Sequence, residues 1–347
     1  MIYSTQILPA GDPLTGHGHI QTAASTLRNG SLVAIPTETV YGLAANALDE
    51  KAVSRIFEVK GRPADNPLIV HIAHISELNQ LAADTPISAQ QLAQNFWPGP
   101  LTMILPSSSA VPALVRAGLD TVAVRMPSHP IALQLIKAAG IPLAAPSANL
   151  SGRPSPTTAA HCLKDLDGLV PIILDGGPCG VGVESTVVSL TGGIPQILRP
   201  GAVTPEQIKS VLGAVMLDPA VYHEPAPSSP VASPGLKHTH YSPKAKVTVL
   251  RGQWENCAQF LEKHREDGAW ALVFEQEMDT CPIPALCLGP KDSPDIHARR
   301  LFSLLRELDE KDAKIVFARA PREEGLGLAV YNRLLRAAGF NELTVDN

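Results

Sequence analysis

A cluster of prolines between residues 219 and 243 constrains the fold of this chain more than any other feature. Six prolines interrupt a run of Ser, Ala and Val there: Pro219, Pro225, Pro227, Pro230, Pro234 and Pro243. Each proline removes a backbone donor and restricts the residue before it, which excludes a helix and favours an extended path. The sequence of 347 residues therefore predicts two domains, residues 1–215 and 245–347, joined by a Pro-rich linker over residues 216–244.

The composition of the chain is that of an ordinary globular protein, with 45% hydrophobic and 18% charged residues. This balance argues against disorder and against a coiled coil. No apolar run approaches the roughly 18 residues of a membrane span, and no basic segment precedes an apolar stretch at the start. The five cysteines contain no Cys-x-x-Cys pair, which favours reduced thiols over a disulfide framework or a zinc site. We therefore expect a cytoplasmic protein with no membrane contact.

Hydrophobic periodicity in the first domain predicts an α/β fold. Strands are expected over residues 31–36, 67–72, 101–106, 121–126, 169–174, 185–190 and 196–198, and helices over 19–28, 50–59, 88–96, 130–139 and 158–166. Thr204-Pro205-Glu206-Gln207 has the pattern of a helix start with a capping box. Because strands follow one another both directly and with helices between them, the sheet is expected to be mixed.

The segment after the linker predicts a small Rossmann-like α/β domain. Strands are expected over residues 247–250, 270–274, 285–288, 314–318 and 343–345, with helices over 254–265, 296–308 and 328–338. Gly325-Leu-Gly327-Leu-Ala329 is followed by Val330, so it lacks the last glycine of a dinucleotide-binding fingerprint. We expect these glycines to serve packing.

Four cations of the first domain lie within two residues of a proline or glycine, in segments expected to be non-helical: Lys60, Arg62, Arg125 and Arg199. Cations on rigid turns at strand ends can converge on a phosphate or a carboxylate, and arginine supplies a bidentate fork. The net charge of −5 means that an anion site must be built locally. For each arginine taken alone, the alternative is a salt bridge between elements.

Three further segments carry polar side chains suited to a ligand. Residues 145–157 place Ser, Asn and Thr between prolines after a buried strand, which predicts a ligand loop or, alternatively, a turn without a ligand. Residues 36–43 place two threonines, a carboxylate and a tyrosine at a strand end, where α/β ligand crevices open. Glu184-Ser185-Thr186 lacks the Gly-x-Ser-x-Gly elbow, so Ser185 is expected to bind a ligand rather than act as a nucleophile.

Taken together, these motifs resemble the YrdC-like domain of the L-threonylcarbamoyladenylate synthase family. The motifs are Pro36-Thr-Glu-Thr-Val-Tyr-Gly-Leu, Lys60-Gly-Arg-Pro-x-x-Asn-Pro-Leu, Trp97-Pro-Gly-Pro-Leu-Thr, Ala145-Pro-Ser-Ala-Asn-x-Ser-Gly, Gly180-Val-Gly-Val-Glu-Ser-Thr-Val-Val and Leu198-Arg-Pro-Gly. Residues 233–243 of the linker and the C-terminal domain resemble the two-domain form of the family. The resemblance implies a twisted mixed sheet around a locally positive cavity, with the linker crossing its mouth as a lid.

The activity implied by the resemblance joins L-threonine, bicarbonate and ATP into threonylcarbamoyl-AMP and releases pyrophosphate. A downstream transferase would place the threonylcarbamoyl group on adenosine 37 of tRNAs that read codons starting with A. The family's motifs assign L-threonine to Thr39, His71, Arg125, Ala145 and Ser185. They assign ATP to Arg62, Asn66, Thr121, Ser147, Ser155, Arg199 and Tyr241. Lys60 and Arg62 are the implied catalytic cations, and Mg²⁺ is expected on the ATP phosphates rather than on protein ligands.

Two other functions compete with this expectation. A module that binds double-stranded RNA or tRNA through the same cavity would need a positive field, but residues 1–210 hold twelve basic and fourteen acidic residues. Weak tRNA contact is compatible with either function. Carbamoyl transfer for metal-cofactor maturation is the other alternative, and the absence of Cys-x-x-Cys pairs argues against it.

Overall fold

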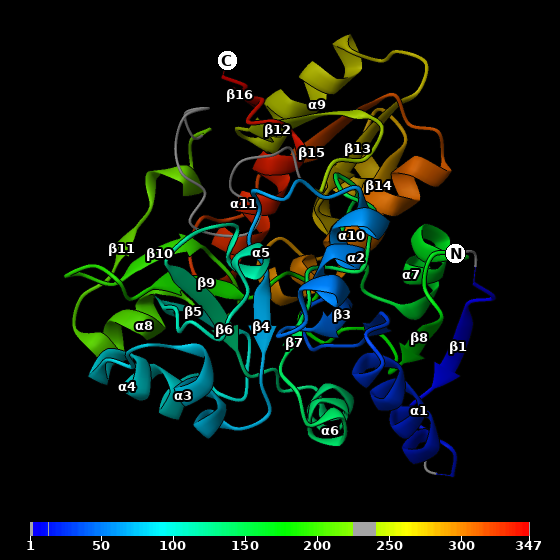
Figure 1. Ribbon diagram of the computed structural model, residues 1–347. Helices are drawn as coiled ribbons and strands as arrows, with labels where there is room; N and C mark the ends of the chain where they lie inside the picture. The colour runs from blue at the N-terminus through cyan, green and yellow to red at the C-terminus, as the bar shows by residue number, and fades with distance from the viewer. Residues whose placement is uncertain (1–2, 13, 225–240, 347) are drawn as a thin grey trace.

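The computed structural model describes residues 3–12, 14–224 and 241–346, which form two α/β domains, each built around its own sheet (Figure 1). The first sheet has eleven strands in the order β1-β8-β2-β3-β7-β4-β6-β5-β9-β10-β11 and contains both parallel and antiparallel pairs. Its strands are β1 Gln6–Pro9, β2 Val33–Ile35, β3 Gly42–Asn46, β4 Ile69–His71, β5 Leu101–Pro106, β6 Thr121–Arg125, β7 Leu143–Ala144, β8 Ile172–Asp175, β9 Thr186–Ser189, β10 Gln196–Arg199 and β11 Met216–Leu217. The expected mixed sheet is confirmed.

Eight α-helices pack around this sheet: α1 Gly16–Arg28, α2 Glu50–Lys60, α3 Leu78–Leu81, α4 Ile87–Phe96, α5 Ala113–Arg116, α6 Pro130–Ala139, α7 Ala159–Leu166 and α8 Pro205–Leu212. Short 3₁₀ turns add η1 Ile75–Glu77 and η2 Pro219–Val221. The predicted capping box at Thr204 is present, since its hydroxyl accepts from the Gln207 backbone and the Gln207 side chain accepts in return.

The C-terminal domain has a five-stranded, all-parallel sheet in the order β14-β13-β15-β12-β16. Its elements are β12 Lys246–Arg251, α9 Trp254–Lys263, β13 Ala269–Val273, η3 Glu275–Thr280, β14 Ala285–Cys287, α10 Pro294–Glu310, β15 Ile315–Arg319, α11 Leu326–Ala337 and β16 Glu342–Thr344. A Cβ atom on Gly327 would lie 2.3 Å from the Arg322 carbonyl oxygen, so this glycine permits close packing at the start of α11, as expected from the sequence.

Four strands of the first domain are absent from the sequence-based prediction: β1, β3, β7 and β11. β3 consists of Gly, Leu, Ala, Ala and Asn, and such small residues carry little strand propensity, although four of the five are buried at the centre of the sheet. β7 and β11 have only two residues each, and β1 is an edge strand with mostly exposed side chains. These strands form because neighbouring strands pair with them, a tertiary effect that local sequence does not carry.

Helices α10 and α11 attach the C-terminal domain to the first domain (Figure 1). The Arg306 guanidinium of α10 donates to the Pro154 carbonyl oxygen and lies 2.7 Å from the Asp165 carboxylate. Val183 of the first domain is fully buried in the hydrophobic core of the C-terminal domain. Gly182, with a φ of +87°, approaches α10 so closely that a Cβ would lie 2.4 Å from the Ala298 carbonyl oxygen. The segment 180–185 is therefore held between the two domains.

The predicted linker is partly described. Helix α11 holds its N-terminal part, because the Asn332 amide donates to the Val221 carbonyl and the Arg336 guanidinium donates to the Ala220 carbonyl. Residues 225–240 lie outside the described residues, and with them most of the expected lid. None of the helices in the described ranges has both the length and the apolar character that a membrane span requires.

Candidate active site

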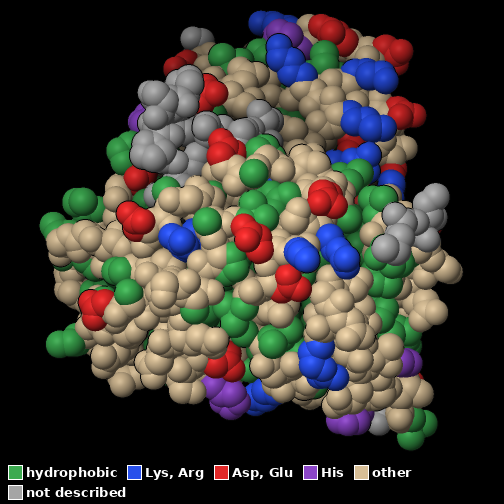
Figure 2. Space-filling view, in the orientation of Figure 1, with side chains coloured by type: hydrophobic (Ala, Val, Ile, Leu, Met, Phe, Trp, Pro, Cys, Tyr) green, Lys and Arg blue, Asp and Glu red, His purple; other side chains and the backbone are tan. Residues whose placement is uncertain are grey.

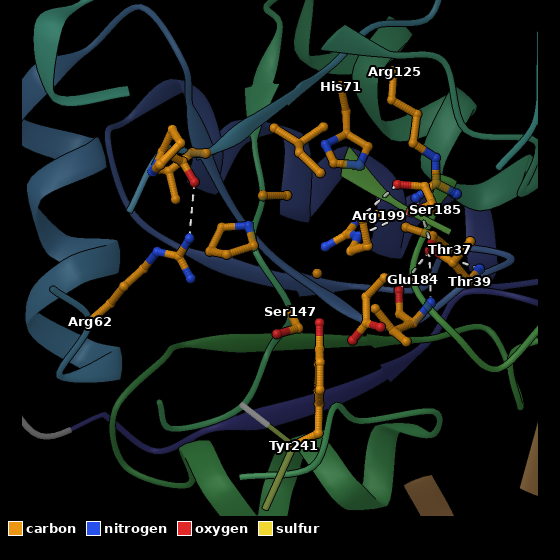
Figure 3. Close-up of a pocket in the computed structure, with 17 residues that line it drawn as sticks. Thr37, Thr39, Arg62, His71, Arg125, Ser147, Glu184, Ser185, Arg199 and Tyr241 are labelled. Carbon is orange, nitrogen blue, oxygen red and sulfur yellow. Dashed lines mark hydrogen bonds between the residues drawn. The ribbon is translucent and has the colours of Figure 1, made fainter. Parts of the chain in front are cut away.

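A cavity at the centre of the first domain brings together nine of the twelve residues that the sequence assigned to L-threonine or ATP. They are Thr39, Arg62, His71, Arg125, Ala145, Ser147, Ser185, Arg199 and Tyr241. These residues come from segments as distant in sequence as Thr39 and Tyr241 of the linker, and their side chains surround one hollow (Figure 3). Arg62 lies at one side of the cavity, opposite Arg125 and Arg199.

Arg125, the last residue of β6, lies deep in one half of the cavity, with only 3% of its surface exposed. Its Nη2 lies 2.6 Å from the Glu38 carboxylate, and its Nη1 donates to the Thr39 hydroxyl at 2.9 Å. Burial alone would raise the pKa of the Glu38 carboxyl, but the positive charge of Arg125 holds it below its usual value. This half of the cavity therefore holds a fixed guanidinium with a hydroxyl beside it.

Ser185 and Arg199 complete the same half. The Arg199 guanidinium donates to the Ser185 carbonyl at 3.1 Å and to the Ser185 hydroxyl at 3.2 Å. A further hydrogen bond joins the Ser185 hydroxyl to the Thr102 hydroxyl at 2.8 Å. Arg199 thus lies with the residues assigned to threonine, although the sequence assigned it to ATP. Arg199 is therefore placed where it could contact either substrate.

His71, the last residue of β4, is buried beside Arg125. Burial and the charge of Arg125 lower the pKa of this histidine to about 3, so its imidazole is neutral at pH 7. Its Nδ1 is buried and makes no hydrogen bond to any residue that the structure describes. A buried ring nitrogen without a protein partner is available to a polar ligand.

Arg62 is placed by the end of helix α2. The helix stops because Gly61 adopts the left-handed conformation, with a φ of +58°. Arg62 follows in the turn, where its guanidinium donates to the backbone carbonyls of Asn66 at 3.2 Å and Pro67 at 2.9 Å. These contacts orient the side chain along the cavity wall and use backbone acceptors only, so its charge is not neutralised by a carboxylate in these contacts.

Lys60 lies next to this turn but does not line the cavity. Its buried ammonium donates to the backbone carbonyls of Ser147 and Asn149 and so anchors the loop that follows β7. Burial and the nearby Arg62 charge lower its pKa well below the usual value. In this structure Lys60 supports the loop that carries Ser147, and its role beside the ATP phosphates stays a prediction.

The remaining residues assigned to ATP also lie outside the cavity lining. Asn66 precedes Pro67 in the wall, and its buried amide makes no hydrogen bond among the described residues. Ser155 is fully buried and donates to the Glu184 carboxylate at 2.5 Å. Thr121 begins β6 and pairs with Pro106 of β5. Of these three side chains, the Asn66 amide has no hydrogen-bond partner among the described residues, and the ATP contacts of all three stay predictions.

Glu184 is a lining residue whose role the sequence did not reveal. Its carboxylate accepts from Ser155 and from Arg333 of helix α11, whose Nε lies 2.7 Å away. Burial would raise the pKa of Glu184, but the charges of Arg333 and Arg199 hold it below its usual value. Residues 184 and 333 are far apart in the chain and in different domains, so no local pattern could have predicted this pair.

The acidic side chains at the cavity decide whether the protein itself could hold a divalent metal ion. Within the described ranges, no three His, Cys, Asp or Glu side chains gather in a way that could hold a metal ion. Glu184 in the wall and Glu38 beside it are each paired with an arginine. Because both carboxylates already pair with an arginine, they are less available to a metal ion than unpaired carboxylates would be.

Comparison with known proteins places this site in a family. Residues 25–201 match the Sua5/YciO/YrdC family, described as "Telomere recombination", and residues 203–339 match the family described as the threonylcarbamoyl-AMP synthase C-terminal domain. A threonylcarbamoyl-AMP synthase of Pyrococcus abyssi is 47% identical over 331 residues, which cover 94% of this chain and 96% of the relative. That of Bacillus subtilis is 45% identical over 339 residues, covering 96% of each chain.

A solved structure extends the likeness to three dimensions. The crystal structure of Pyrococcus abyssi Sua5 complexed with L-threonine superposes with a TM-score of 0.91 at 44% identity, covering 98% of this chain and 100% of that one. Sequence motifs, fold and both domain matches agree over nearly the whole length. This chain therefore belongs to the family of two-domain threonylcarbamoyl-AMP synthases.

Proposed function

We propose that this protein joins L-threonine, bicarbonate and ATP to form threonylcarbamoyl-AMP, with release of pyrophosphate and water. The observation that carries the proposal is the convergence of Arg62, Arg125 and Arg199 on one cavity in a chain of net negative charge. Two anionic substrates can occupy such a cavity together only if fixed positive charge offsets their repulsion. The named activity of the full-length relatives supports the same reaction.

L-Threonine is proposed to occupy the half of the cavity that contains Arg125. The guanidinium would bind the substrate carboxylate, and the Ser185 and Thr39 hydroxyls would contact its polar groups. The neutral imidazole of His71 offers an acceptor for the substrate ammonium or hydroxyl group. Holding the carboxylate at one fixed point orients the amine for attack on bicarbonate or CO₂.

ATP is proposed to occupy the other half, along Arg62 and the loop that carries Ser147. The Asn66 amide, which lacks a partner among the described residues, would contact the nucleotide. The carbamate formed on threonine would attack the α-phosphorus, a bond from phosphorus to carbamate oxygen would form, and the bond to pyrophosphate would break. Arg62 and Arg199 would stabilise the charge that develops on the phosphate oxygens. Mg²⁺ held by those oxygens would supply further positive charge.

Exclusion of water is part of the proposed mechanism, because the carbamate and the acyl adenylate both hydrolyse readily. Tyr241, the first described residue after residues 225–240 of the linker, lines the cavity, and its ring centre lies 5.2 Å from that of Phe302. Tyr241 is suited to close the cavity once both substrates are bound, and the linker would act as a lid.

The product is proposed to supply a downstream transferase that modifies adenosine 37 of tRNAs reading codons that start with A. We place this reaction in the cytoplasm, where ATP and tRNA are available, and the five cysteines are free thiols there. On the face drawn in Figure 2, acidic and basic side chains are interspersed rather than gathered into a basic stripe. The net charge of −5 likewise favours the enzyme over the tRNA-binding module.

One assay tests the proposal. The purified chain is incubated with L-threonine, bicarbonate, Mg²⁺ and ATP, and pyrophosphate release is followed together with mass spectrometry of the adenylate. We expect pyrophosphate and threonylcarbamoyl-AMP only when all four are present. Pyrophosphate release that does not depend on threonine, or no release at all, would contradict the proposed reaction. Tight tRNA binding with a steep salt dependence and no turnover would instead support the binding module.

A further inference from the structure

The C-terminal domain reaches the cavity wall through one fully buried side chain. Arg333 lies in helix α11, has no exposed surface, and directs its guanidinium at the first domain. Its Nε donates to the Glu184 carboxylate at 2.7 Å, and its Nη2 donates to the Glu184 carbonyl at 3.3 Å. Its Nη1 donates to the Asn332 side chain at 2.9 Å, which fixes the guanidinium from the other side.

Glu184 links Arg333 to Ser155 and Ser185, two residues assigned to the substrates. Its carboxylate accepts from the Ser155 hydroxyl, and its backbone leads directly to Ser185, whose hydroxyl contacts Arg199 and Thr102. The Arg333 guanidinium also lies 5.7 Å from the centre of the Tyr241 ring. One arginine outside the first domain therefore contacts the side chain and backbone that precede Ser185 and the face of Tyr241.

Arg333 also neutralises the negative charge of Glu184. Glu184 is 7% exposed and lies in the wall of a cavity proposed to hold a triphosphate and a carboxylate. An ionised carboxylate at that point would repel both substrates if it had no partner. Removing one partner of a buried ion pair is strongly destabilising, because the other charge is left buried without compensation. The residues around that charge then have to rearrange.

We propose that Arg333 is a positioning residue for catalysis: through its bonds to Glu184 it neutralises the carboxylate in the cavity wall and holds Ser155 and Ser185 in place for the substrates. This inference rests on the proposed function. It gives the C-terminal domain a part in the reaction, since α11 completes an active site whose substrate contacts otherwise belong to the first domain and the linker.

The test is a double-mutant cycle on the pair. Four proteins are compared, the wild type, Arg333→Met, Glu184→Gln and the double variant, and the KM for ATP, the KM for threonine and kcat are measured for each. Arg333→Met is expected to raise the KM for ATP at least about tenfold, because ATP carries the largest negative charge near Glu184. Glu184→Gln in the same chain removes the unpaired charge, so the double variant is expected to recover most of that loss. Arg333→Lys keeps the charge and should retain more activity than Arg333→Met.

A matched control separates positioning from stability. Arg306→Met removes another buried arginine that pairs across the same domain boundary, with Asp165, at a point outside the cavity lining. Thermal unfolding of every variant is measured beside the kinetics. Arg306→Met is expected to lower the unfolding temperature and leave the KM for ATP within about twofold of wild type.

Two results would overturn the inference. One is an Arg333→Met enzyme whose KM for ATP is unchanged while the wild type turns over normally. The other is a parallel loss of unfolding temperature and kcat in Arg333→Met and Arg306→Met, with no recovery in the double variant, which would make Arg333 purely structural. A wild-type enzyme that forms no threonylcarbamoyl-AMP would instead contradict the proposed function, so the two failures are distinguishable.

Discussion

The guanidinium of Arg125 and the carboxylate of Glu38 lie 2.6 Å apart beside the cavity. The sequence predicted that Arg125 would bind the carboxylate of threonine and left a salt bridge as the alternative. The structure shows the salt bridge and also places Arg125 in the cavity lining. Glu38 therefore orients the guanidinium, and the substrate carboxylate would bind the same group from the cavity side.

Removal of Arg125 should weaken threonine binding more than ATP binding. A charge-assisted hydrogen bond contributes about 1.5–3 kcal/mol, so Arg125→Ala is expected to raise the KM for threonine roughly ten- to hundredfold. The measurement is pyrophosphate release against threonine concentration at saturating ATP. Arg125→Ala also leaves Glu38 buried without a cation, so Glu38→Gln in the same chain should recover stability without recovering threonine binding. Recovery of both would mean that Arg125 serves only to neutralise Glu38.

Arg62→Ala should raise the KM for ATP and leave the fold intact. Its guanidinium donates hydrogen bonds to the backbone carbonyls of Asn66 and Pro67, and Pro67 lines the cavity. We expect a loss of roughly tenfold or more in kcat/KM for ATP, with little change in unfolding temperature. Arg55→Ala is the matched control, because Arg55 is exposed on helix α2, which precedes the Arg62 turn, and donates to the Gly30 carbonyl away from the cavity. Equal kinetics in the two variants would exclude a phosphate role for Arg62.

Lys60 gives a different expectation, because its ammonium is buried against the loop after β7. Lys60→Met leaves the carbonyls of Ser147 and Asn149 without their donor, at a cost of about 1–3 kcal/mol in the free energy of unfolding. Turnover should fall as well, since Ser147 lines the cavity. Denaturant unfolding of the wild type and of Lys60→Met, each with and without ATP, measures the loss of stability, and pyrophosphate release measures turnover. A variant as stable as the wild type but inactive would favour the phosphate role predicted from the sequence over the role in anchoring the loop.

Some strands of the first domain could be predicted from the sequence and others could not. β5 was predicted with its observed bounds because the residues of Leu101–Pro106 other than Thr102 are apolar, and the strand is buried on both faces. β3 was missed because glycine and alanine fill a crowded position at the centre of the sheet, where Gly42 forms a bridge to Ser147. Local propensity reports what a residue prefers in isolation, and central strands of small residues form through their neighbours.

The candidate site likewise contains residues that the sequence predicted and residues that it did not. Arg62, Arg125 and Arg199 were predictable because a proline follows each of them within two residues and marks a rigid segment, and strand ends face ligand crevices. The pairing of Glu184 with Arg333 was not predictable, because it joins two domains and leaves no periodic or local pattern. Sequence thus indicated which cations could meet a ligand, and the three-dimensional structure showed which groups orient them.

His71 provides a test in pH. Its pKa is lowered from 6.5 to about 3 in the folded protein by burial and by the charge of Arg125. Between these values the unfolded chain binds a proton that the folded chain does not, so His71 causes stability to fall as the pH falls from 6.5 towards 3, by at most about 1.4 kcal/mol per pH unit. His71→Gln removes this contribution, and its free energy of unfolding should decline less steeply than that of the wild type over the same window. His161→Gln is the control: the pKa of His161 is lowered to about 4 by burial, but this residue lies outside the cavity lining, so its variant should keep wild-type threonine binding. A stability difference between wild type and His71→Gln that does not change from pH 6.5 to pH 4 would show that the imidazole is not held neutral by the fold.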